Sequence, residues 1–342
     1  MTKKKSKKLF MNMIIILIIE RMVIYFTFNG KNKFPLDAIL HLSPLWVSVL
    51  LVLMAAYFIL DGINLYSFGK LYNRDYTYRQ GFVNSICGTF FSGITPFSSG
   101  GQFAQVYIFN KQGIGPANSA SILMMAFIVY QTVLVGFTAI IMFFRYRIYR
   151  DIYLNFFYLA IVGFIVNVSV ICGLFLCSKS KKLQNFLSNT VVKGLNKIGL
   201  IKNYEETSMK LSQSLESFRT ELSNLQNNKV VLIKSTFINF FKLLIIYSIP
   251  FFAARALSLN IPFIKILTFI EICSFVYMIT AFVPIPGASG GSEGVYYMLF
   301  SPILGKLGTP TTLLIWRFMT YHLGLIIGGL TFATNRDINR LE

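Results

Sequence analysis

The sequence predicts an all-α protein, a polytopic bundle of transmembrane helices with two re-entrant or broken helices at Gly/Pro motifs. The 342 residues are 55% hydrophobic, with a mean hydropathy of +0.61 and 13% charged residues. Soluble domains carry about 25% charged residues. Many of the apolar stretches are long enough to cross a bilayer, and a polar Gly/Pro-rich stretch among them recurs later in the chain. We therefore expect one integral membrane domain over residues 1–342.

Apolar stretches of about 20 residues are needed to span a membrane. The first follows the basic run MTKKKSKK, and no small-residue cleavage site comes after it, so we expect an uncleaved helix there rather than a signal peptide. Shorter apolar pieces at 81–95 and 294–305 flank the Gly/Pro motifs. The predicted spans are 9–28, 44–66, 117–144, 152–177, 230–256, 263–283 and 311–333.

Lysine and arginine in the loops predict the orientation, because such residues gather on the cytoplasmic side. Their excess in 1–8, 67–80 and 178–229 predicts a cytoplasmic N-terminus and two cytoplasmic loops. Residues 81–116 must then enter and leave on one face, so we expect a re-entrant segment or a pair of half-helices there. The same count of crossings puts the second motif on the cytoplasmic side too, and it leaves the arginines of 145–150 outside.

The 178–229 loop is predicted to be a cytoplasmic helical connector. Its apolar residues recur at helical spacing, which indicates helices that lie at the membrane surface or against the bundle. A packed connector and a docking site for a partner both fit this pattern. The apolar positions are Leu183, Leu187, Val191, Leu195, Leu211, Leu215, Phe218, Leu222 and Leu225.

Two segments share one helix-breaking pattern. PFSSGGQFAQVY at 96–107 aligns without gaps with PGASGGSEGVYY at 286–297. The identical pairs are Pro96/Pro286, Ser99/Ser289, Gly100/Gly290, Gly101/Gly291 and Tyr107/Tyr297. Unwound backbone persists at membrane depth only where it is buried in protein or lines a wet cavity. Matched breaks in two halves of a chain indicate a transporter's substrate site.

Each motif precedes an apolar helix, and a helix N-terminus offers free N–H groups and partial positive charge to a phosphate. Two such termini facing each other could hold a phospholipid headgroup. Alternatively, the SGG sequences only cap and pack two helices, with Glu293 matching a helix dipole. The candidate lipid-binding residues in the motifs are Ser98, Ser99, Gly100, Gly101, Gln102, Ser289, Gly290, Gly291 and Glu293.

Ionisable residues within apolar spans form a second set of candidates, because charge at membrane depth is costly. Lys242 lies near the middle of its span and must find a carboxylate or a ligand phosphate. Glu271 could pair with Arg317 or with Lys242, and buried ion pairs that only fix helix packing are the alternative. The residues concerned are Glu20, Arg21, Asp61, Lys242, Arg255, Glu271, Glu293, Arg317 and His322; of these, Lys242, Glu271 and Arg317 join the candidate lipid site.

Several functions are disfavoured. The net charge of +19 comes from short loops beside apolar spans, which indicates contact with anionic lipid rather than with nucleic acid. The four cysteines lack the spacing of a metal site, and no GxxxxGK[ST] motif for ATP is present. We expect no cofactor.

The segments TPFSSGGQFAQVYIFNKQGI and VPIPGASGGSEGVYY resemble the transmembrane, flippase-like region of bacterial lysylphosphatidylglycerol synthases, which include the multiple peptide resistance proteins. The resemblance covers about 10–335. In full-length relatives a cytosolic domain transfers lysine from lysyl-tRNA to phosphatidylglycerol, and the membrane region moves the product outward. This chain ends at NRDINRLE soon after its last span, so we expect no soluble catalytic domain.

The resemblance implies a multi-pass protein of the bacterial cell membrane that binds and translocates a phospholipid. Lysyl-phosphatidylglycerol or another anionic or aminoacylated lipid is the expected substrate. The alternative is phosphatidylglycerol lysyltransferase activity, or the role of membrane partner to such an enzyme. A separate aminoacyltransferase and a homo-oligomer stay open as partners.

Overall fold

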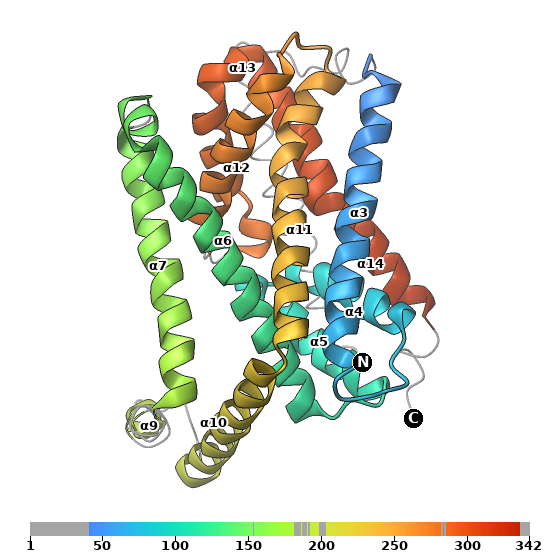
Figure 1. Cartoon of the computed structure of the whole chain (residues 1–342), viewed down its shortest axis with the longest axis vertical. Coiled ribbons are helices and arrows are strands. Elements are labelled where there is room, and N and C mark those ends of the chain that lie inside the picture. Colours follow the sequence, from blue (N-terminus) through green and yellow to red (C-terminus); the bar gives the residue numbers. More distant parts are fainter. Residues whose placement is uncertain are drawn as a thin grey trace.

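The chain folds into a helical bundle, seen in a computed structural model (Figure 1). The described residues are 41–335, without 153, 181–185, 187–189, 191, 198–202, 282 and 284. All regular structure in this part is helical, which confirms the all-α prediction. The helices are α3 Pro44–Gly69, α4 Tyr78–Gly93, η1 Pro96–Ser98, α5 Ser99–Lys111, α6 Pro116–Ile152, α7 Leu154–Lys179, α9 Val192–Lys197, α10 Tyr204–Asn227, α11 Lys229–Ala256, η3 Phe263–Lys265, α12 Ile266–Thr280, η4 Pro286–Ala288, α13 Gly291–Arg317, the π-helix η5 Phe318–His322 and α14 Leu323–Thr334.

Six described helices are long and apolar enough to cross a membrane, which confirms a multi-pass membrane protein. They correspond to six of the seven predicted spans, whereas the predicted span 9–28 lies outside the described residues. The six are Pro44–Gly69, Pro116–Tyr149, Tyr158–Leu176, Lys229–Ala256, Phe263–Thr280 and Gly308–Thr334.

One hydrogen bond between neighbouring segments marks each of the two ends of the bundle. At one end the backbone N–H of Ser43, before α3, donates to the carbonyl of Ala256 at the end of α11 (2.9 Å). At the other end, α3 runs into the 70–77 loop, where Asn73 Nδ2 donates to the carbonyl of Gln112 (3.4 Å). We call these the Ser43 end and the Asn73 end. The antiparallel helices α3 and α11 lie side by side between them (Figure 1).

The helices α4 and α5 form a re-entrant hairpin from the Asn73 end. Thr77 caps the start of α4, and Gln112, just after α5, donates from Nε2 to the carbonyl of Gln80 (3.0 Å). The start of α4 and the end of α5 therefore lie side by side. The buried Tyr76 hydroxyl donates to Gln112 Oε1 (2.9 Å), and burial raises its pKa, which keeps the donor proton in place. The prediction that this segment enters and leaves on one face is confirmed.

The helix α12 and the first part of α13 form a second re-entrant hairpin, which enters from the Ser43 end. Glu293 and Arg317 of α13 are in contact, although a straight helix would separate them by about 36 Å at 1.5 Å per residue. The chain therefore reverses between them, at Gly305, where φ is 69° and ψ is 177°. A Cβ placed on Gly308 would lie 3.2 Å from Leu259, in the loop that follows α11, so this reversal lies at the Ser43 end.

The second hairpin corrects the sequence-based count of crossings. That count treated 263–283 as a complete span and so placed both motifs at the same side. In the structure α12 ends at Thr280, about 22 Å from its start at helical rise. The chain then breaks at η4 and returns to the Ser43 end. The two motifs thus enter from opposite ends, because an apolar stretch of spanning length is also long enough to be half of a hairpin.

The 178–229 connector contains α9 and α10. The helix α10 contacts α6 and α7 as well as the start of α11, and it lies at the Asn73 end (Figure 1). The helix α10 packs against the bundle, and the cytoplasmic location of the connector stays a prediction. Most side chains of its predicted apolar seam lie outside the described residues.

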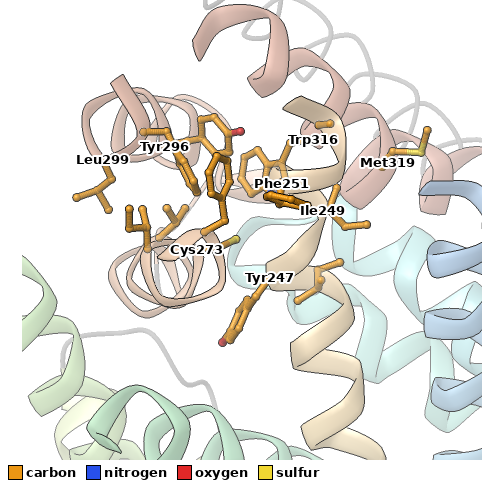
Figure 2. Packing of buried hydrophobic residues seen from close by; sticks show 14 of the residues in the cluster. Tyr247, Ile249, Phe251, Cys273, Tyr296, Leu299, Trp316 and Met319 are labelled. Carbon is orange, nitrogen blue, oxygen red and sulfur yellow. The ribbon is translucent and has the colours of Figure 1, made fainter. Parts of the chain in front are cut away.

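The core lies where α11, α12 and α13 meet. Aromatic side chains fill it: Tyr296 stacks on Trp316 (ring centroids 4.7 Å apart) and on Phe300 (4.4 Å), both also on α13. Figure 2 shows Tyr296 and Trp316 in one cluster with Phe251 of α11 and Cys273 of α12. Because α13 supplies rings from both sides of its reversal, this core packs the second hairpin against α11.

Close packing of α4 on α3 gives a direct test of the first hairpin. A Cβ on Gly81 would lie 2.8 Å from the Gly62 carbonyl oxygen and 2.8 Å from the Tyr66 backbone nitrogen, whereas a Cβ on Gly136 of α6 would meet nothing within 4 Å. We expect Gly81→Ala to lower the free energy of unfolding by about 1–3 kcal/mol through overpacking. Gly136→Ala should leave it unchanged or raise it by up to about 1 kcal/mol. Unfolding in mixed detergent micelles measures both, and equal effects would contradict the α3–α4 contact.

Candidate functional site

The two breaks share an unusual backbone. In the first, Phe97 and Ser98 have φ of 55° and 53°, and in the second, Gly287 and Ala288 have φ of 59° and 51°. Left-handed conformations are rare for residues other than glycine, so their occurrence at matched positions is informative. The sequence repeat is therefore also a repeat of backbone conformation. Such strained residues gather at functional sites.

The two breaks touch. The turns η1 and η4 are in contact, although one hairpin comes from each end of the bundle. Tyr321 of the π-helix η5 joins them: its hydroxyl donates to the Gly93 carbonyl at the end of α4 (3.1 Å). A Cβ on Gly287 would lie 2.3 Å from the Tyr321 ring, so only glycine fits against that ring. Single π-helical turns within α-helices often mark functional sites.

At the first break the helix N-terminus is already capped. The Gly100 N–H donates to the Thr95 hydroxyl (2.8 Å), which in turn donates to the Phe91 carbonyl (2.7 Å). A Cβ on Gly101 would lie 1.9 Å from Ser92 Oγ, so this glycine allows α5 to pack on α4. Ser98, Ser99 and Gln102 are exposed, and Ser99 donates to the Pro96 carbonyl (3.0 Å).

At the second break a buried ion pair is present. Arg317 Nε lies 2.5 Å from Glu293 Oε1, and the two side chains are 9% and 6% exposed. Arg317 Nη2 donates to the Gly287 carbonyl and to Ser289 Oγ, both at 3.0 Å. Glu293 Oε2 accepts from the Gly290 N–H (2.6 Å). Four predicted site residues, Ser289, Gly290, Glu293 and Arg317, are thus brought together, and Gly291 begins the helix beside them.

Lys242 forms a separate charged site between α3 and α11. It pairs with Asp61, and its ammonium lies 5.2 Å from the centre of the Tyr57 ring and 5.9 Å from that of Tyr130. Lys242 is buried and Asp61 is 22% exposed. Of the two partners expected for Lys242, a carboxylate or a ligand phosphate, the structure shows a carboxylate, that of Asp61. This pair joins the two long antiparallel helices rather than the two breaks.

Neither predicted pairing of Glu271 is present. Its Oε1 instead pairs with Arg145 Nε of α6 (3.3 Å), and its Oε2 accepts from the Tyr149 hydroxyl. Both predicted partners are already engaged, Arg317 with Glu293 and Lys242 with Asp61. The predictions failed because ion-pair partners depend on which helix faces lie side by side, and residue depth within a span does not determine that.

Two residues of the site were missed in the sequence. Tyr321 lies one helical turn after Arg317, and the guanidinium centre lies 4.5 Å above its ring. An aromatic residue four positions from a buried arginine was a usable signal for this contact. Thr95 precedes the first motif and caps Gly100, but a single threonine before a proline carries no specific signal. Among the described residues there is no cluster of His, Cys, Asp or Glu that could hold a metal.

The crossing helices and the two broken hairpins define a multi-pass α-helical membrane protein. The family model described as "Lysylphosphatidylglycerol synthase TM region" matches residues 13–328, and the chain belongs to that family. No curated protein and no solved structure matches the chain in the comparisons made.

The Lys242–Asp61 pair gives a stability test of the α3–α11 contact. Breaking a buried ion pair leaves one charge unpaired and costs about 3–5 kcal/mol, whereas replacing both partners is often neutral. We therefore expect Asp61→Asn to destabilise the protein more than the double variant Asp61→Asn/Lys242→Met. Thermal unfolding in detergent compares the two. Equal losses would mean that Lys242 finds its compensation elsewhere.

Proposed function

We propose that this protein binds a phospholipid and moves it between membrane leaflets. The proposal depends on one observation: two broken hairpins enter from opposite ends and touch, and a buried arginine lies beside the second break. Broken helices with breaks that meet inside the bundle are the usual place of a transporter's substrate site. Membership of the family supports a membrane lipid as the ligand class.

The proposed substrate is lysyl-phosphatidylglycerol or another anionic or aminoacylated phospholipid. Arg317 presents a planar guanidinium suited to a phosphate. The N-terminus of α13 adds backbone N–H groups and partial positive charge. The exposed Ser98, Ser99 and Gln102 of the first break supply polar groups beside the path.

We propose that the Asn73 end faces the cytoplasm of a bacterial cell. The basic 67–80 loop and the helices of the 178–229 connector both lie at this end, as the distribution of lysine and arginine requires. In this orientation the first hairpin opens from the cytoplasmic side and the second from the outer side. The two breaks then meet on the route of a headgroup between leaflets.

Translocation in liposomes tests the proposal. The double variant Glu293→Gln/Arg317→Gln removes both charges without leaving one unpaired, and we expect it to slow transfer of acyl-labelled phosphatidylglycerol about tenfold or more, because charge-assisted hydrogen bonds contribute about 1.5–3 kcal/mol. Dithionite bleaching of the outer leaflet gives the rate. The matched control is Asp75→Asn/Arg79→Gln, which removes one exposed charge of each sign. Unchanged transfer in the first double variant, with the control also unchanged, would reject the second break as the site.

A further inference from the structure

Glu293 occupies the position in which an anionic ligand would be bound. Its Oε2 accepts from the Gly290 N–H (2.6 Å) and from Ser292 Oγ (3.0 Å), at the N-terminus of α13. Its Oε1 lies 2.5 Å from Arg317 Nε. A carboxylate of the chain itself therefore uses the partial positive charge and the cation that would attract a phosphate.

Arg317 retains donor capacity in this arrangement. A guanidinium has five N–H donors. The hydrogen bonds described for it run from Nη2, to the Gly287 carbonyl and to Ser289 Oγ. The buried Nε makes no aligned hydrogen bond, although Glu293 is close. The carboxylate of Glu293 therefore satisfies the hydrogen-bonding capacity of the buried guanidinium only in part.

There is room for a ligand beside the pair. A Cβ added to Gly290 or to Gly294 would meet no atom within 4 Å, and these two residues flank Glu293 on the first turn of α13. In the first break Gly100 is equivalent to Gly290, and a Cβ on Gly100 would lie 2.4 Å from the Thr95 side chain. Gly294 aligns with Ala104. Open space therefore lies at the break that also carries the buried charges.

We propose that Glu293 is a built-in competitor that a phosphodiester displaces from Arg317 and from the N-terminus of α13. A phosphodiester and a carboxylate each carry one negative charge, so the exchange leaves Arg317 compensated throughout. The leaving carboxylate moves into the space beside Gly290 and Gly294. This inference rests on the proposed function for the identity of the phosphodiester, a phospholipid headgroup, and it assigns Glu293 to regulation of that site rather than to lipid contact.

Removing the competitor should strengthen binding. If the carboxylate occupies the site most of the time, Glu293→Gln raises the apparent affinity for the anion by about tenfold or more, because apparent affinity scales with the competent fraction. The chain has two tryptophans, Trp46 and Trp316. Trp316 lies next to the site, with its ring centre 5.9 Å from the Arg317 guanidinium. In a Trp46→Phe background its fluorescence reports binding in detergent.

The probes are dihexanoyl-phosphatidylglycerol and inorganic phosphate. We expect the short-chain lipid to bind the Glu293→Gln variant more tightly than the parent, and not to bind Glu293→Gln/Arg317→Gln. Equal affinity in parent and Glu293→Gln would overturn the proposal. Binding of phosphate without binding of the lipid would overturn the assignment to a phosphodiester.

Thermal unfolding keeps the test decisive if Glu293→Gln is unstable. The single variant leaves Arg317 unpaired, so the short-chain lipid should raise its melting temperature more than that of the parent or the neutral double variant. Absence of this extra stabilisation would overturn the proposal.

Liposome transfer distinguishes this inference from the proposed function. Tighter binding by Glu293→Gln with no transfer by the parent rejects translocation alone. Transfer by the parent with unchanged binding rejects the competitor alone.

Discussion

Backbone groups that lose their helical partners must be satisfied inside the bundle, because hydrocarbon offers no hydrogen bonds. Each break meets this constraint with side chains. Thr95 accepts from the Gly100 N–H, and Tyr321 donates to the Gly93 carbonyl across to the other hairpin. Arg317 donates to the Gly287 carbonyl, and Glu293 accepts from the Gly290 N–H. One of these hydrogen bonds, from Tyr321 to Gly93, links the first break to η5, and the other three each lie at a single break.

The two copies of the motif differ in charge and in packing. The left-handed pair of residues is common to both breaks. The two breaks differ in charge, however, at the third residue after Gly100 and Gly290. Glu293 aligns with Phe103, which is 78% exposed. The first break therefore has a neutral cap and a packed glycine pair, while the second has an ion pair and open space. In the proposed function, the attraction of an anionic headgroup therefore comes from one side only, the break that enters from the Ser43 end.

Much of the fold could be predicted from the sequence, because apolar length and Gly/Pro breaks act locally. Six apolar helices long enough to span and the first hairpin followed from those signals. The second hairpin did not, since 263–283 is long enough to span and the reversal rests on Gly305 alone, between two prolines of an apolar helix. The partners of Lys242 and Glu271 also could not be predicted. Which helices lie side by side is decided by packing of the whole bundle.

The Glu293–Arg317 pair stabilises the fold, and it also occupies the proposed binding position of the ligand. It joins the two parts of α13 across the reversal at Gly305, and so it holds the returning arm of the second hairpin against the segment that follows. In the proposal made above, the same pair fills the anion position at the break. Any ligand that takes Arg317 must replace that closure with an interaction of equal charge and similar geometry, since an unpaired buried arginine is costly. On the proposal made above, such a site favours monoanionic groups.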